Sequence, residues 1–117
     1  MVIVVSPKEL RVFETVDGRR PFDQWLDSLR DKLTVARIAS RLNRVALGNL
    51  GDVKSIGGGV SELRLAFGSG YRVYFGQDGD RIILLLCGGD KGTQERDIRV
   101  ARIYLEEYRR RGHDKKK

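Results

Sequence analysis

An alternation of apolar and polar residues between positions 60 and 75 constrains the fold of this chain most strongly. The segments 60–67 and 71–75 each carry an apolar side chain at every second position, which is the pattern of half-buried strands. The glycine-rich segment 68–70 joins them as a hairpin connection. The apolar residues form one face of this hairpin, toward the core: Leu63, Leu65, Phe67, Tyr71, Val73 and Phe75. The sequence therefore predicts a β-hairpin with one buried face.

Polar side chains occupy the other face of the same hairpin. They are Glu62, Arg64, Arg72 and Tyr74. Guanidinium groups stay charged and bind two phosphate oxygens through a planar fork. We therefore expect a small sheet face that points away from the core and handles phosphate groups.

The first half of the chain predicts one strand and two helices. Residues 10–16 are rich in strand formers and end at a turn signal, Asp17-Gly18. Pro21 suits the first turn of a helix, and apolar residues follow at helical spacing to Leu29. Asp31 can cap a second helix that runs to about Leu47.

The second half predicts further strands and a last helix. Segment 53–56 predicts a short strand, and segment 81–87 is apolar on both faces, as in a central covered strand. Thr93 can cap a final helix, whose inward stripe contains Ile98, Ala101, Leu105 and Tyr108. The predicted class is α+β, in the order strand, helix, helix, three or four mostly antiparallel strands, helix. We expect the helices of residues 21–47 to cover one sheet face and the other face to remain partly open.

The length and the charge of the chain limit the number of domains and the kind of partner that we expect. A chain of 117 residues is long enough for one modest core, so we expect a single domain over residues 1–111. Residues 112–117 would form a basic, disordered tail. The formal net charge of +7 favours an anionic partner.

The scarcity of cysteine and histidine excludes several kinds of site. With one cysteine, Cys87, and one histidine, His113, neither an intrachain disulfide nor a usual zinc site can form within one chain. Cys87 lies in the most apolar run and is expected to fill the core. Residues 1–6 lack a signal-peptide pattern, and no segment has the length of a membrane span. We expect a cytoplasmic protein without metal or cofactor, whose chemistry uses arginine, lysine, tyrosine and carboxylates.

Three blocks of sequence carry a resemblance to a known family. They read GVSELRL at 59–65, GSGYRVYF at 68–75 and LLCGGDKGTQERDI at 85–98. In combination they resemble toxins of the RelE/ParE superfamily, and more narrowly the HigB-like, phage Gp49-related branch of type II toxin–antitoxin systems. The resemblance covers residues 10–110. It implies a RelE-like fold and a cognate helix-turn-helix (HigA-like) antitoxin, and we expect the free toxin to be a monomer.

The resemblance implies two different activities on one fold. RelE-like members cleave mRNA in the ribosomal decoding site, whereas ParE-like members inhibit DNA gyrase without cleaving anything. Because a gyrase inhibitor has no need of a phosphate-binding cluster, the arginines favour a ribosome-dependent mRNA endonuclease that needs no metal. A third possibility is a non-enzymatic module whose basic face docks an acidic segment of the antitoxin.

The resemblance also suggests roles for single residues. By analogy with basic residues on the matching strands, Arg64 and Arg72 would stabilise the phosphate in the transition state. Glu62, which stands where RelE-type enzymes often carry a basic residue, is a candidate general base, and Tyr74 a candidate acid or a stacking surface for a base. Alternatively, Glu62 only forms a cross-strand ion pair on a solvated face. The remaining RNA-binding candidates are Lys54, Lys91 and Gln94.

Overall fold

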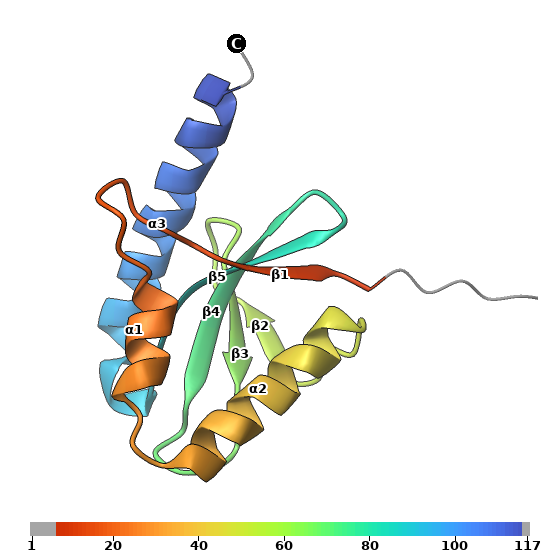
Figure 1. Ribbon diagram of the computed structural model, residues 1–117, viewed down its shortest axis with the longest axis vertical. Coiled ribbons are helices and arrows are strands. Elements are labelled where there is room, and N and C mark those ends of the chain that lie inside the picture. The colour runs from red at the N-terminus through yellow and green to blue at the C-terminus, as the bar shows by residue number, and fades with distance from the viewer. Residues whose placement is uncertain (1–6, 116–117) are drawn as a thin grey trace, which may run out of the picture.

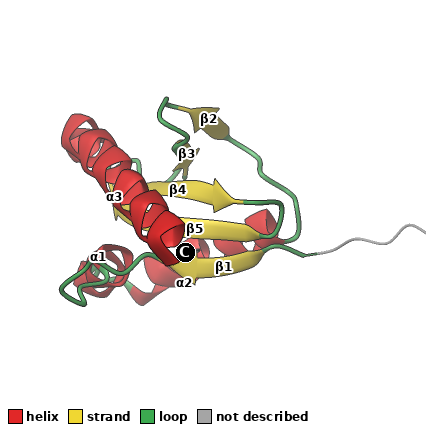
Figure 2. Ribbon diagram, turned by 90° about the horizontal axis from the view of Figure 1, so that it is seen from above, coloured by secondary structure: helices red, strands yellow, loops and turns green. Residues whose placement is uncertain are grey.

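One five-stranded sheet organises the protein, and helices lie on both of its faces (Figures 1 and 2). The computed structural model describes residues 7–115. The strand order is β1-β5-β4-β3-β2, with β1 parallel to β5 and all other neighbours antiparallel. The strands are β1 (Glu9–Val12), β2 (Val53–Ser55), β3 (Ser61–Arg64), β4 (Arg72–Asp78) and β5 (Ile82–Gly89). The predicted α+β class and the mostly antiparallel strands are confirmed.

Two helices cover one face of the sheet and the third covers the other, as Figure 2 shows. They are α1 (Pro21–Ser28), α2 (Lys32–Ala46) and α3 (Gln94–Lys115), the last preceded by a 3₁₀ turn, η1 (Lys91–Thr93). Pro21 stands at the start of α1, where a missing N–H costs no hydrogen bond. The side chain of Asp31 accepts from the backbone N–H of Leu33 and caps α2, as predicted.

The first core lies between the sheet and the helices α1 and α2. The apolar residues of the hairpin meet Phe22, Ile38, Leu42 and Val45 there. Leu63, Leu65, Val73 and Phe75 are buried in this cluster, and Phe67 and Tyr71 pack against it. The face predicted from the alternation is therefore confirmed.

A second core lies under α3, and it overturns the prediction of a partly open face. Ala101 and Leu105 of α3 are buried against Val60, which stands just before β3, and against four residues of the sheet: Tyr74, Leu84, Leu86 and Cys87. Strand β5 is buried on both faces, as predicted for a central strand. The pairing of β4 with β5 contains a bulge: Tyr74 is opposite Cys87 and Phe75 is opposite Leu85, so Leu86 is an extra residue in β5. Leu86 and Cys87 both belong to this second cluster.

Several element boundaries differ from those predicted. Strand β1 ends at Val12 because the chain turns soon afterwards, where the N–H of Thr15 bonds to the carbonyl of Arg19. Helix α3 continues to Lys115, so residues 112–115 of the expected disordered tail are helical, and the last two lie outside the described residues. Residues 1–6 also lie outside them. No helix in the described part of the chain is long and apolar enough to cross a membrane.

Candidate functional site

A cluster of polar side chains lies where β3 and β4 meet the start of α3. In the β3–β4 register, Arg64 is opposite Arg72 and Glu62 is opposite Tyr74. Arg72 is in turn opposite Gly89, the last residue of β5, and α3 begins five residues after it. The hairpin register therefore brings together the four polar residues that the alternation placed on one face.

Glu62 is the buried centre of this cluster. Its side chain has no exposed surface. Its carboxylate accepts hydrogen bonds from Arg64 Nε at 2.8 Å, from the Tyr74 hydroxyl at 3.0 Å and from Gln94 Nε2 at 2.8 Å. Burial by itself would raise the pKa of Glu62, but the hydrogen bonds from Arg64, Gln94 and Tyr74 together hold the pKa below its ordinary value. Glu62 is therefore a charged, fully engaged acceptor.

The two arginines surround this carboxylate differently. The Arg64 side chain is 38% exposed, whereas that of Arg72 is only 12% exposed. Arg72 donates from Nη1 to the carbonyl of Gly70 at 2.9 Å, while its Nε lies 3.7 Å from Glu62 and has no hydrogen-bond partner among the described residues. Two cations opposite each other on neighbouring strands repel each other. The negative charge of Glu62, which lies close to both guanidinium groups, offsets this repulsion.

Tyr74 lies inside the second core, which corrects the prediction of an accessible phenol. The residue is fully buried, so its ring cannot stack on a nucleobase. Burial and the hydrogen bond to Glu62 raise the pKa of its hydroxyl. Tyr74 is therefore a neutral hydrogen-bond donor that holds Glu62, and it is a poor proton donor to a substrate.

The other predicted residues border the same cluster. Lys54 is opposite Glu62 on the edge strand β2 and is exposed. Lys91 is exposed in η1 and lies beside the 68–70 turn, since its N–H bonds to the carbonyl of Ser69 at 3.4 Å. Gln94 uses its amide to hold Glu62. The structure thus places Arg64, Arg72 and Lys91 at one end of the sheet, and we call these three residues the basic cluster.

The start of α3 lies at the same end of the sheet and is capped by side chains. Asp90 accepts from the N–H of Gly92 at 2.8 Å, and Thr93 Oγ1 accepts from the N–H of Asp90 at 3.2 Å, which together form a capping box around η1. Asp90 is the cap of η1, and Thr93, which was predicted to cap the last helix and stands directly before α3, is the second member of this capping box. The partial positive charge of this helix N-terminus already has carboxylates of the protein beside it, Asp90 of the cap and Glu95 and Asp97 of the first turn of α3, so the positive charge at this end comes from the basic cluster.

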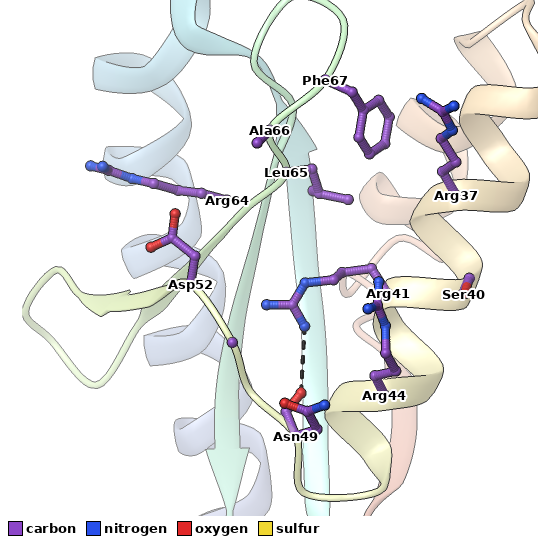
Figure 3. Close-up of a pocket in the computed structure, with 11 residues that line it drawn as sticks. Arg37, Ser40, Arg41, Arg44, Asn49, Asp52, Arg64, Leu65, Ala66 and Phe67 are labelled. Atoms are coloured by element: carbon purple, nitrogen blue, oxygen red, sulfur yellow. Dashed lines mark hydrogen bonds between the residues drawn. The ribbon is translucent and has the colours of Figure 1, made fainter.

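Three arginines of α2 form a basic surface that the prediction missed. Arg37, Arg41 and Arg44 line a pocket of about 600 Å³ with Arg64, Asp52 and Phe67 (Figure 3). Their spacing of four and three residues puts them on one side of a helix, and this signal was available in the sequence. We call this the α2 pocket.

Comparison with known proteins identifies the family. A family model described as phage derived protein Gp49-like (DUF891) matches residues 24–109. The chain belongs to this Gp49-like family. The family is RelE-like and associated with toxin–antitoxin systems. An uncharacterized protein of Haemophilus influenzae (strain ATCC 51907 / DSM 11121 / KW20 / Rd) is 44% identical over 86 residues, which are 74% of this chain and 87% of that protein. No solved structure matches. The basic cluster and the α2 pocket both lie within the Gp49-like region.

Proposed function

We propose that this Gp49-like protein is the toxin of a type II toxin–antitoxin system and cleaves mRNA on the ribosome. The observation that carries the proposal is the basic cluster, in which Arg64 and Arg72 lie opposite each other beside the start of α3. In this proposal the protein acts in the cytoplasm, and its HigB-like activity is neutralised by a HigA-like helix-turn-helix antitoxin.

In this proposal the basic cluster stabilises the negatively charged phosphorane that forms during cleavage. In metal-independent cleavage, the ribose 2′-hydroxyl passes its proton to water and its oxygen attacks phosphorus. The bond from phosphorus to the 5′-oxygen breaks, the 5′-oxygen takes a proton from water, and a 2′,3′-cyclic phosphate remains. Negative charge grows on the nonbridging oxygens during this step. Guanidinium groups fixed before the reaction stabilise that charge without having to reorganise. Arg72 would supply a fixed guanidinium, and Lys54 and Lys91 would bind the flanking RNA backbone.

Glu62 has a different role here from the general base suggested by its sequence position. Its carboxylate already accepts three hydrogen bonds and has no exposed surface, so the 2′-hydroxyl cannot reach it in this arrangement. Glu62 instead acts as a positioning residue that orients Arg64 and Arg72. Tyr74 and Gln94 support it from below.

A translation assay with purified ribosomes tests the proposal. The intact protein should cut mRNA in the A site, Arg72→Ala should abolish cleavage, and Arg64→Ala should weaken it. Arg110→Ala removes an exposed arginine from α3 and serves as the control that should cleave normally.

A gyrase inhibitor is the second candidate function, and the burial of Glu62 and Tyr74 favours it. Both groups were expected to take part in catalysis, and neither is accessible. If the intact protein leaves ribosome-bound mRNA whole and instead traps gyrase–DNA complexes, this ParE-like function replaces the nuclease. Neutralisation by the antitoxin is expected in both cases and does not distinguish them.

A further inference from the structure

The α2 pocket gathers positive charge on the side of the sheet that faces α2. Four arginines and one carboxylate, Asp52, belong to its lining, and one of the four arginines, Arg64, is already ion-paired with Glu62. Among the residues whose side chains the structure describes, no carboxylate forms an ion pair with Arg37, Arg41 or Arg44. Burial, and then the charge of Arg44, lower the pKa of Arg41, and the nearby charge of Asp52 opposes them only in part. A site in which like charges repel in this way is suited to an anion from outside.

The individual arginines of the pocket are held in different ways. Arg41 donates to the backbone carbonyls of Asn49 and Leu50 and so fixes the loop after α2. The guanidinium of Arg37 lies over the ring of Phe67, 5.3 Å from its centroid, as a cation–π pair. Arg44 is exposed and makes neither kind of contact with the residues whose side chains the structure describes. Arg37 and Arg44 are therefore the two helix arginines available to a ligand.

The pocket has the size and the chemistry of a nucleotide site. Its volume of about 600 Å³ is within the range of small-ligand sites. Arginine binds phosphate through its fork, and bases of single-stranded RNA stack on guanidinium planes and aromatic rings. An acidic helical peptide would need an extended apolar groove, whereas here the apolar lining is confined to the segment 65–67.

Arg64 connects the pocket with the basic cluster. It lines the α2 pocket and also donates to Glu62 in the cluster. Figure 3 shows its side chain pointing away from α2, while Arg41 reaches from the helix toward Asn49 and Arg44 lies along the helix beside Arg41. A single strand that passes over the end of β3 would therefore contact both sites.

We propose that the α2 pocket binds a nucleotide next to the scissile phosphate on the same single-stranded RNA. The proposal rests on the proposed function, because it makes the pocket a subsite of the nuclease. Arg37 and Arg44 bind the flanking phosphate, and Phe67 keeps Arg37 in place.

The experiment measures RNA binding apart from cleavage. A fluorescein-labelled single-stranded RNA that is 2′-O-methylated throughout cannot be cut by 2′-hydroxyl attack, so its affinity for the full-length protein can be titrated at several salt concentrations. We expect Arg44→Ala to weaken binding about fivefold at 0.1 M salt and to reduce the salt slope by about 0.7, the value for one phosphate contact on a single strand. Arg37→Ala should behave similarly. The matched control Arg110→Ala removes one exposed helix arginine from the other face of the sheet and should change affinity less than about twofold.

Each result decides between the alternatives. Equal losses for Arg44→Ala and Arg110→Ala would mean that only net charge matters, and would overturn the proposal. The proposal would also be overturned if Arg44→Ala bound RNA normally but bound the antitoxin weakly, since the pocket would then be a docking site for a protein. A parallel ribosome assay separates the two proposals. If the intact protein does not cleave mRNA, the proposed nuclease function is wrong, even if the RNA affinity still depends on Arg44. If the intact protein cleaves and Arg44→Ala binds RNA normally, the pocket proposal fails alone.

Discussion

Glu62 shows how a residue that looks like a surface acid can be the centre of a buried network. Its sequence position, alternating with core residues, indicated only that it faces away from the first core. Because α3 covers that second face, the carboxylate is enclosed with Tyr74 and Gln94. A buried carboxylate that accepts several charged or polar hydrogen bonds is costly to remove, since its partners lose their acceptor.

We expect Glu62→Gln to lower the free energy of unfolding by about 2 kcal/mol, because an amide accepts fewer hydrogen bonds and carries no charge to offset Arg72. Urea denaturation followed by circular dichroism measures the change. Glu106→Gln alters an exposed carboxylate on α3 and should shift stability by less than about 0.5 kcal/mol. A fully stable Glu62→Gln protein would show that the network adds no net stability.

The pH dependence of stability follows from the same residue. The pKa of Glu62 is lower in the folded protein than its ordinary value of 4.5. Its ionised form therefore stabilises the fold at pH values above 4.5, and this contribution is lost as the pH falls through the lower folded pKa. Unfolding free energies of the intact protein and of Glu62→Gln should differ most near neutral pH and converge in acid. A constant difference at all pH values would contradict this assignment.

Arg72→Lys tests whether charge alone serves the basic cluster. Lysine keeps the positive charge but cannot reproduce a fork that donates to Gly70 and faces Glu62 at the same time. We expect mRNA cleavage on ribosomes to fall about 100-fold, as for the loss of one fixed donor to a transition state. Circular dichroism would show whether the variant remains folded. Cleavage at the normal rate would mean that a point charge is enough.

At the level of elements, the sequence predicted the strands and helices better than their arrangement. The period-two pattern of Leu63 and Val73 identified the face toward α1 and α2, because every second side chain of a strand points the same way. Alternation does not say what covers the other face. The apolar stripe of α3, with Ala101 and Leu105, had to be buried on something, and this was the available signal that Glu62 and Tyr74 would be enclosed.

The packing of α1 on β5 depends on a residue without a side chain. A Cβ at Gly88 would overlap the indole ring of Trp25, which packs on the sheet there. We expect Gly88→Ala to lower the free energy of unfolding by about 1–3 kcal/mol, the usual cost of overpacking a core. Gly112→Ala is the matched control in α3, where a Cβ meets nothing within 4 Å and alanine favours the helix. The control should be stabilising by up to about 1 kcal/mol in thermal or urea unfolding. Equal stabilities of the two variants would contradict close α1–β5 packing.

At the level of the whole molecule, one sheet separates two cores and its end carries the site. The basic cluster lies on the α3 side and the α2 pocket on the other, with Arg64 between them. The composition indicated an anionic partner. A net charge does not say where on the surface the charged residues lie, so only the fold could show that the arginines of α2 and of the hairpin meet at one end of the sheet.

The extent of the domain gives a last prediction. Several contacts that attach α3 lie at or before residue 111: Ala101 and Leu105 are buried, and Arg111 donates to the carbonyl of Glu14 at 2.5 Å and covers the ring of Phe13. A protein that ends at Arg111 loses residues 112–117, and its formal net charge falls from +7 to +5. We expect its melting temperature to stay within about 4 °C of the full-length value, a change in unfolding free energy of less than about 1 kcal/mol, since these contacts remain. A protein that ends at Asp90 lacks all of α3, exposes the second core with Glu62, and should not fold. Unfolding of the protein that ends at Arg111 would instead show that residues 112–117 belong to the domain.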